Sequence, residues 1–209
     1  LLESCRKMKS PPKQFLGASA VGIYGAQRID PCAEDAEPGT DFLAHVCKHW
    51  ELEAQKAEDL GMRVSIARFG VVLSPRGGAL KKMMLPFQMG VGGALGDGKQ
   101  WMSWVSLSDA VYAVYHLLMR NDLKGAFNIT APNPVSNQEF TKTLGSVLKR
   151  PTILPVPGFA IKAALGEMGQ DLLLKGVAAP PTHLQQVGFK FTHPQLQEAL
   201  RHELGLKNT

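Results

Sequence analysis

Short apolar runs alternate with longer stretches of helical spacing over the first 130 residues of the chain. The runs Gln14–Ser19 and Arg63–Arg68 are brief and rich in small or β-branched residues, which is typical of buried strands. Between them, the apolar spacing predicts a helix that is capped by Thr40 or Asp41 and ends at about Leu60. A strand, a helix and a second strand in this order form the parallel crossover unit of doubly wound α/β folds.

The pattern continues with one more strand and several helices. Gly125–Thr130 has the composition of a strand, and Ser136-Asn-Gln-Glu139 is a capping box that opens a helix to Leu148. The other predicted helices cover residues 110–119, 159–174 and 182–187, with a last helix ending at about residue 204. We therefore expect an α/β protein with a doubly wound parallel sheet, followed by a smaller α-rich C-terminal domain for substrate.

Residues 74–98 interrupt this pattern because they are rich in glycine, with the basic pair Lys81-Lys82 at their centre. We interpret the segment as an excursion of the chain over a ligand site. The spacing from Gly93 to Lys99 matches most of a phosphate-binding P-loop, but Gln100 stands where a hydroxyl must reach Mg²⁺. Nucleotide hydrolysis is therefore not expected.

The composition excludes several classes of protein. Of the 209 residues 44% are hydrophobic, which excludes disorder and coiled coils, and the net charge of +5 is spread over scattered single charges, which does not favour nucleic acid. The three cysteines lack metal or disulfide spacing, so we expect a reducing, cytoplasmic location. No apolar run approaches the roughly 18 residues of a membrane span. His45 and His49 share a helical face without a third ligand, so no metal site is expected.

Candidate functional residues follow two of the predicted strands. Ser19 ends the first strand and Tyr24 lies just beyond it, while Arg68 ends the second strand and leads to Gly70, where the backbone can approach a ligand closely. Parallel strands flanking one crossover helix end at the same edge of a sheet, where doubly wound folds bind ligands. The sequence thus indicates one dinucleotide crevice at this edge.

Several strings of the sequence, in this order, carry a resemblance to a known family. They are Ser19-Ala-Val-Gly-Ile-Tyr-Gly25, Asp41-Phe-Leu-Ala-His-Val-Cys-Lys-His-Trp-Glu51, Arg68-Phe-Gly-Val-Val-Leu73, Gln100-Trp-Met-Ser-Trp-Val105 and Asn128-Ile-Thr-Ala-Pro-Asn-Pro134. The chain resembles the epimerase family proteins, an atypical branch of the extended short-chain dehydrogenase/reductases related to NAD-dependent epimerase/dehydratases. The resemblance implies the C-terminal part of a Rossmann-like NAD(P)-binding domain over residues 1–130, with a substrate lid at about 74–105. The segment from about Pro151 to the end resembles the family's small C-terminal domain of unknown function, and we expect a small C-terminal domain over residues 131–209.

The resemblance also implies roles for individual residues, with NADP or NAD as the cofactor. Ser19 would orient a substrate oxygen, and Tyr24 would donate a proton if it faces the crevice. The residues expected to bind the cofactor are Ser19, Ala20, Val21, Arg68, Gly70, Val71 and Val72. Lys81, Trp101 and Trp104 are expected to contact the substrate, for which the family favours a nucleotide-sugar or a similar polar small molecule.

Two features depart from the superfamily pattern. The glycine-rich phosphate fingerprint of the first strand–helix turn does not occur before Ser19, so we expect an N-terminally truncated chain. None of the three tyrosines is followed four residues later by lysine, the pair in which the ammonium favours the phenolate of the general acid/base. Alignment on Glu51 places Leu43 and Cys47 at the positions of that pair, whereas alignment on Lys48 places Ala44 at the position of the tyrosine.

Two classes of function remain open on these residues. The first is an atypical NAD(P)-dependent reductase or epimerase-like enzyme that lacks the Tyr-x-x-x-Lys pair. The second is a non-catalytic dinucleotide sensor or scaffold, which the missing pair favours. A homodimer is expected because the first helix and the helix from Asp41 to Leu60 match helices that pair in dimers of the superfamily.

Overall fold

Three parallel strands form the central sheet of the computed structural model, which describes residues 1–26, 28, 30–153 and 176–206. Their order is β1 (Gln14–Ala20), β2 (Arg63–Phe69) and β6 (Gly125–Ile129). The register pairs Ser19 with Arg68 and Arg68 with Asn128, so all three strands end near one edge. The predicted strands and their parallel arrangement are confirmed.

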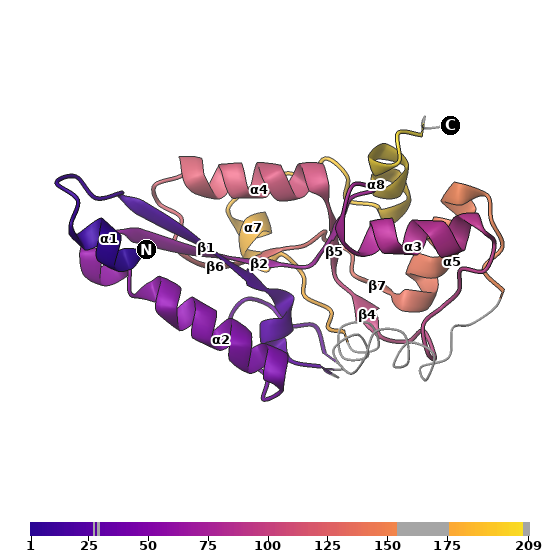
Figure 1. Cartoon of the computed structure of the whole chain (residues 1–209), viewed down its shortest axis with the longest axis horizontal. Coiled ribbons are helices and arrows are strands. Elements are labelled where there is room, and N and C mark those ends of the chain that lie inside the picture. Colours follow the sequence, from indigo (N-terminus) through magenta and orange to yellow (C-terminus); the bar gives the residue numbers. More distant parts are fainter. Residues whose placement is uncertain (27, 29, 154–175, 207–209) are drawn as a thin grey trace.

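Helices cover both faces of this sheet (Figure 1). One face carries α1 (Leu2–Arg6) and α2 (Phe42–Gln55), where Ala54 packs in a core cluster with Ile66. The opposite face carries α4 (Leu107–Met119) and α7 (Thr182–Gln186), and Phe127 belongs to its core cluster. Helices on both faces of a parallel sheet define the doubly wound, Rossmann-like class expected from the sequence.

Side-chain caps begin the longer helices where the sequence places them. The Asp41 carboxylate accepts a hydrogen bond from the Ala44 N–H at 2.9 Å, and the helix after it is followed by a short 3-10 turn, Glu58–Leu60. The Ser136 hydroxyl accepts from the Glu139 N–H at 3.1 Å and opens α5 (Asn137–Leu148), which confirms that half of the capping box. These contacts satisfy N–H groups that have no partner inside a helix.

The segment expected as a glycine-rich excursion is more ordered than predicted. It contains α3 (Gly78–Gln88), which the glycines and Pro86 concealed in the sequence. Two small sheets flank it: β3 (Val71–Leu73) pairs in parallel with β5 (Trp104–Ser106), and β4 (Trp101–Met102) pairs antiparallel with β7 (Val135–Ser136).

A second core lies beyond the edge of the main sheet. It joins α3 to α5 and α8 (Leu196–Glu203), with Leu80, Phe140 and Leu200 fully or almost fully buried. The core therefore spans residue 130, and the division into domains there stays a prediction. The helix predicted over 159–174 lies outside the described residues.

The buried carboxylate of Asp109 links this region to the main sheet. It accepts hydrogen bonds from the backbone N–H groups of Thr192 and His193 at 2.7 and 2.9 Å, which anchors the loop before α8 to the start of α4. Glu203 of α8 adds a contact by accepting from the Leu107 N–H at 2.9 Å. Both contacts hold the elements beyond the sheet edge in place.

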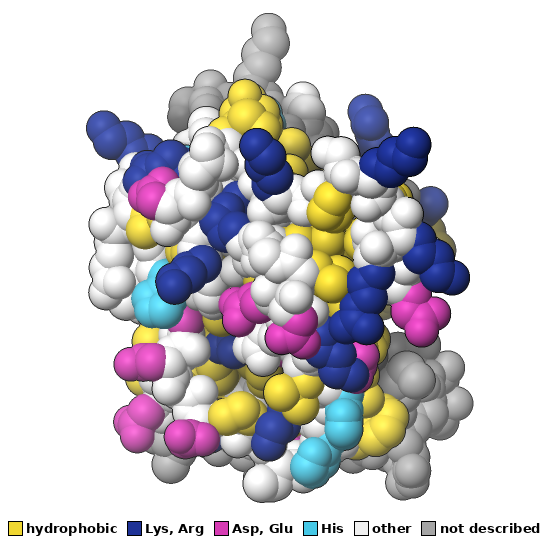
Figure 2. All heavy atoms as spheres, turned by 90° about the vertical axis from the view of Figure 1, so that its left-hand side faces the viewer, with side chains coloured by type: hydrophobic (Ala, Val, Ile, Leu, Met, Phe, Trp, Pro, Cys, Tyr) yellow, Lys and Arg dark blue, Asp and Glu magenta, His cyan; other side chains and the backbone are white. Residues whose placement is uncertain are grey.

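The surface agrees with the scattered charges of the sequence. Figure 2 shows the end of the molecule that carries α1, where Lys and Arg side chains are spread over the face with Asp and Glu among them. None of the helices in the described residues has the length and apolar character that crossing a membrane requires.

Candidate functional site

A cavity of about 360 Å³ lies where β1 and β2 end. Ala20 and Val21 line it from the end of β1, and Gly70 and Val71 line it from the end of β2 and the start of β3. This is the position at which doubly wound folds bind ligands, because the loops that follow the strands diverge there. Its volume is in the range of small-molecule sites.

Ser103 holds the floor of the cavity against the strand ends. A Cβ atom on Gly70 would lie 2.3 Å from the Ser103 carbonyl oxygen, so only glycine fits between them. That oxygen accepts from the Val71 N–H at 2.7 Å. The Ser103 hydroxyl donates to the Val177 carbonyl at 2.7 Å and accepts from the Ala179 N–H at 2.8 Å. One serine therefore joins the β2–β3 turn to the segment after residue 176.

Helix α2 forms a second wall that is apolar throughout. Leu43, Val46, Cys47 and Trp50 line the cavity, and their spacing places them on one helical face. Burial raises the pKa of the Cys47 thiol, so this group is neutral at physiological pH. The positions aligned with the superfamily's Tyr-Lys pair, Leu43 and Cys47, thus present a hydrocarbon and a thiol to the cavity.

The third wall comes from the region expected as a lid. Ala79 and Met83 of α3, together with Trp101 and Met102 of β4, also line the cavity. Trp101 is 37% exposed and Trp50 across the cavity is 57% exposed, so both lie at the opening. Residues of this segment thus line the cavity, and its role as a lid over a substrate stays a prediction.

Ser19 lies directly behind the cavity wall. The residue is 5% exposed, and its hydroxyl makes no hydrogen bond of ordinary geometry among the described residues, although it lies close enough to the Cys47 thiol to lower the pKa of that thiol. The Cys47 thiol is its polar neighbour. Ser19 is not among the residues that line the cavity, but its neighbour Ala20 is. The hydroxyl is therefore buried one residue away from the cavity wall.

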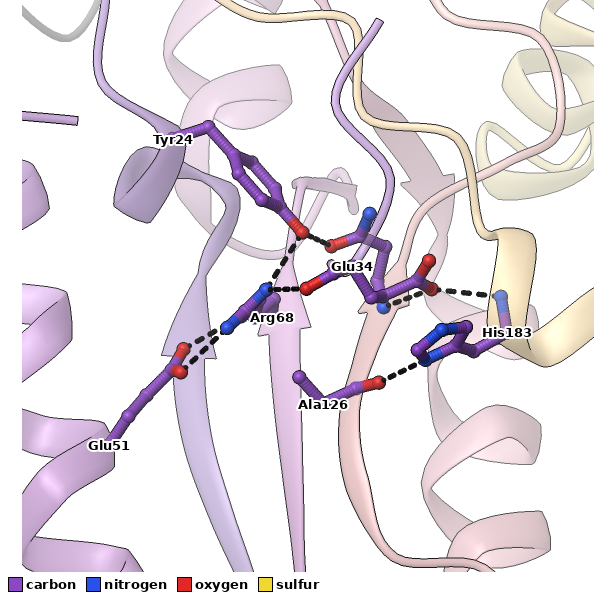
Figure 3. A network of polar contacts seen from close by, with 7 residues as sticks. Tyr24, Glu34, Glu51, Arg68, Ala126 and His183 are labelled. Carbon is purple, nitrogen blue, oxygen red and sulfur yellow. Dashed lines mark hydrogen bonds and ion pairs between the residues drawn. The ribbon is translucent and has the colours of Figure 1, made fainter. Parts of the chain in front are cut away.

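Tyr24 does not line the cavity, and its hydroxyl lies in a buried network (Figure 3). Its hydroxyl donates to the Asn128 side-chain oxygen at 2.7 Å and accepts from the Arg68 guanidinium at 3.0 Å. Burial raises the pKa of Tyr24 to about 12, against a smaller lowering by Arg68. Proton donation by Tyr24 was expected only if its side chain faces the crevice. In the structure its hydroxyl is hydrogen-bonded to Asn128 and Arg68 instead.

Arg68 is the centre of that network rather than a wall of the cavity. Its Nε and Nη2 atoms donate to the two carboxylate oxygens of Glu51 at 2.9 and 2.8 Å. Its Nη1 atom donates to the Glu34 carbonyl at 2.8 Å as well as to Tyr24. The pKa of Arg68 is raised because the Glu51 bonds outweigh the effect of burial. The guanidinium is therefore permanently charged, and four of its five N–H groups are hydrogen-bonded.

Glu34 extends the network to the far side of the sheet. One of its carboxylate oxygens accepts from the backbone N–H groups of Asn128 and His183, at 3.0 and 3.1 Å. The His183 ring contacts the Ala126 carbonyl at 2.9 Å (Figure 3). The loop of residues 31–36, β6 and α7 are thus joined behind the site.

The remaining predicted site residues lie in three different surroundings. Val72 packs against the core of the α4 face, and Trp104 is fully buried with its indole N–H donating to the Asn133 carbonyl at 3.0 Å. Lys81 is exposed on α3 and does not line the cavity. The structure thus brings Ala20, Val21, Gly70, Val71 and Trp101 together around one space, and places the others outside it.

Sequence reasoning did not assign the α2 and α3 residues of the wall. The spacing of Leu43, Val46, Cys47 and Trp50 is visible in the sequence, but an apolar stripe on a helix is also what a core-facing helix shows. Met83 was hidden inside the glycine-rich segment. A search for apolar stripes with exposed aromatic residues at one end would have found the α2 wall.

Comparison with known proteins decides the family. Residues 1–130 match the family described as the NAD dependent epimerase/dehydratase family. The chain belongs to this family. Residues 156–203 of this epimerase family member match a domain of unknown function, DUF1731. Both matches confirm the resemblance seen in the sequence.

Similar proteins come from bacteria and plants. The chain is 44% identical to an epimerase family protein of Mycobacterium bovis over 186 residues, which cover 89% of this chain and 62% of that protein. It is 45% identical to the chloroplastic SDR39U1 homolog of Arabidopsis thaliana over 190 residues, covering 91% of this chain and 54% of that protein. The chain thus spans little more than half the length of these relatives.

Two solved structures share the fold closely. Human epimerase family protein SDR39U1 (isoform 2), crystallised with NADPH, superposes with a TM-score of 0.92 at 30% identity, covering 97% of this chain and 69% of that chain. The nucleoside-diphosphate sugar epimerase of Corynebacterium glutamicum gives a TM-score of 0.80 at 32% identity, covering 97% and 40%. These matches confirm the Rossmann-like fold.

Replacing Glu51 by alanine tests the buried ion pair. The Glu51→Ala change leaves a charged guanidinium without its partner inside the protein, so we expect unfolding free energy to fall by about 3–5 kcal/mol. Glu53→Ala is the matched control on the same helix, because Glu53 pairs with Lys56 at the exposed surface and such pairs contribute about 1 kcal/mol or less. Urea denaturation measures both, and equal losses would contradict the assignment.

The raised pKa of Tyr24 predicts a loss of stability at alkaline pH. Folding moves this pKa from 10.0 to about 12, so the folded state keeps a proton that the unfolded state loses above pH 10. Stability therefore falls as pH rises from 10 towards 12, at up to about 1.4 kcal/mol per pH unit from this group.

Urea denaturation at pH 9, 10 and 11 measures this slope. Tyr24→Phe should flatten it, whereas Tyr112→Phe, on the exposed face of α4, should leave it as it is. An unchanged slope in Tyr24→Phe would show that another group controls alkaline stability.

Proposed function

We propose that the protein is an atypical NADP(H)-dependent oxidoreductase or epimerase-like enzyme. The observation that carries this proposal is the cavity at the shared edge of β1 and β2, in a chain whose family is described as NAD dependent. The structure of human SDR39U1 with NADPH favours NADP(H) over NAD(H). Nucleotide-sugars are the first substrate class to test, since a nucleoside-diphosphate sugar epimerase shares the fold.

The strand-end wall fits the nicotinamide part of this cofactor. Ala20, Val21 and Gly70 carry small side chains or none, so a flat ring can lie against the backbone there, with Val71 beside it. When bound, the cofactor supplies or accepts a hydride. The apolar surroundings exclude water from the reacting face.

Ser19 is the side chain that we assign to orienting a substrate oxygen. It is buried, unpaired among the described residues and adjacent to Ala20 of the cavity wall. Leu43 cannot exchange a proton, and burial keeps the Cys47 thiol protonated. We therefore assign the polar contact with the substrate at the strand ends to the Ser19 hydroxyl, one residue behind Ala20 of the wall.

A non-catalytic dinucleotide sensor or scaffold is the second candidate. Leu43 and Cys47 favour it, because they occupy the positions of the superfamily's acid/base pair and line the cavity. The cytoplasmic location, a homodimer through α1 and α2, and the division into domains at residue 130 belong to the same set of proposals.

NADPH titration with a cavity variant tests cofactor binding. In the full-length product of the gene, Val21→Asp puts a carboxylate beside the nicotinamide position, and we expect calorimetry to give an NADPH dissociation constant at least tenfold higher. Val111→Asp, on the exposed face of α4, is the matched control. Equal affinity in both variants, at unchanged melting temperature, would rule out this position for the nicotinamide.

Ser19→Ala separates the enzyme from the sensor. We expect turnover of an accepted substrate to fall at least tenfold while NADPH affinity stays within twofold, because the hydroxyl contacts substrate and not cofactor. Ser108→Ala, on α4 away from the cavity, is the control. Full turnover in Ser19→Ala would remove Ser19 from the mechanism, and NADPH binding without turnover of any substrate would favour the sensor.

A further inference from the structure

The substrate side of the cavity has an unusual lining for a nucleotide-sugar site. Of the 24 described residues that line the cavity, 16 carry apolar side chains and four are glycines. The four polar residues are Asp41, Gln100, Ser103 and Asn137. No lysine, arginine or histidine is among these described lining residues, and the single charged group is the carboxylate of Asp41.

These polar side chains make hydrogen bonds within the protein. Asp41 accepts from the backbone N–H groups of Ala44 and Ala26, at 2.9 and 2.7 Å. Asn137 accepts from the Leu95 N–H at 2.8 Å and its amide contacts the sulfur of Met102. Ser103 is occupied on both sides by residues 177 and 179. These groups position the wall: Ser103 already donates its hydroxyl hydrogen to Val177, and the Asp41 carboxylate has no hydrogen to donate to a pyrophosphate.

A nucleotide-sugar would therefore find no cationic side chain among the described lining residues. Its pyrophosphate loses hydration on entering a cavity, and that loss is offset only by cations or by free N–H donors. The charge of Asp41 acts in the opposite direction, since it repels an anion across an apolar space. An uncharged ligand meets neither penalty.

Apolar side chains at the opening point to the same conclusion. Phe42 is 72% exposed, Trp50 is 57% exposed and Trp101 is 37% exposed, and all three line the cavity. Large apolar side chains gathered in the open around a cavity mark a surface that binds apolar partners. Met83 on the facing wall adds a flexible apolar side chain, which adapts to ligand shape.

The nicotinamide ring does not account for this lining. The ring is assigned to the strand ends, at Ala20, Val21 and Gly70. The walls away from the strand ends, formed by α2, α3 and β4, are equally apolar, with Val46, Met83 and Met102 among their residues. These are the walls that a second molecule would contact.

We propose that the cavity binds an uncharged, mainly apolar small molecule, aliphatic or aromatic, in place of a nucleotide-sugar. This inference rests on the proposed function for its cofactor, but the binding of such a molecule is measurable without turnover. The mouth formed by Phe42, Trp50 and Trp101 receives the molecule, and Leu43, Val46 and Met83 surround it inside.

Displacement of a neutral fluorescent dye tests the proposal. Nile red is bound to the full-length gene product, with and without NADPH, and is displaced by 2-decanone or by UDP-glucose. We expect 2-decanone to displace the dye with a dissociation constant at least tenfold lower than that of UDP-glucose. Tighter binding of UDP-glucose, or no displacement by 2-decanone, would overturn the proposal.

Three variants locate the ligand. Val46→Asp and Met83→Gln alter two different walls of the cavity, and each should weaken 2-decanone at least fivefold at an unchanged melting temperature. Leu52→Asp is the matched control, because Leu52 lies on α2, is 48% exposed and does not line the cavity. If Leu52→Asp lowers the affinity for 2-decanone as much as the two wall variants do, the ligand does not bind in this cavity.

The separate NADPH titration distinguishes the two proposals. A protein that binds NADPH and prefers UDP-glucose keeps the proposed function and loses the substrate inference. A protein that binds 2-decanone with the expected wall dependence but not NADPH keeps the apolar site and loses the proposed function.

Discussion

The buried ion pair between Arg68 and Glu51 fixes the parts from which the site is built. Taking a guanidinium out of water costs several kcal/mol unless its N–H groups find partners. Here Glu51, Tyr24 and the Glu34 carbonyl supply those partners. Helix α2, the turn Val21–Tyr24 and the loop around Glu34 therefore have one arrangement in which the charge is satisfied. That arrangement sets the face of α2 that borders the cavity.

The polar and apolar parts of the site are separated by the strand ends. Behind them, Tyr24, Arg68 and Glu34 form a network that is closed to solvent, and its raised tyrosine pKa keeps the phenol neutral. In front of them lies a space bordered mainly by hydrocarbon. The charged and titratable residues Tyr24, Arg68 and Glu34 thus stabilise the fold, and the residues that line the cavity determine its shape.

Local patterns in the sequence were sufficient for the sheet and its helices. The three strands, the cap at Asp41 and the cap at Ser136 depend on neighbours a few residues away, so they could be predicted. The network could not, because Tyr24 and Asn128 meet across 104 positions of the chain. Arg68 illustrates the difficulty, since its place at a strand end suits a ligand contact and an internal ion pair equally well.

Helix α3 was missed for a different reason. Its sequence starts beside two glycines and contains Pro86, both of which oppose helices locally. Packing of Leu80 and Phe87 into the second core overrides this preference. Since Ala79 and Met83 of that helix line the cavity, the missing element also hid one wall of the site.

Ser103 has a consequence for the way the cavity can discriminate between molecules. Through its carbonyl and hydroxyl it is bonded to Val71, Val177 and Ala179 at once, with Gly70 pressed against it. Ser103, the turn at Gly70–Val71 and the segment 177–179 are therefore held together by these bonds. None of them can move alone to make room for a larger ligand. The size of ligand accepted at this end should therefore depend on the distance between the backbones at Gly70 and Ser103. Adjustment to ligands of different shape is left to the methionine and tryptophan side chains that also line the cavity.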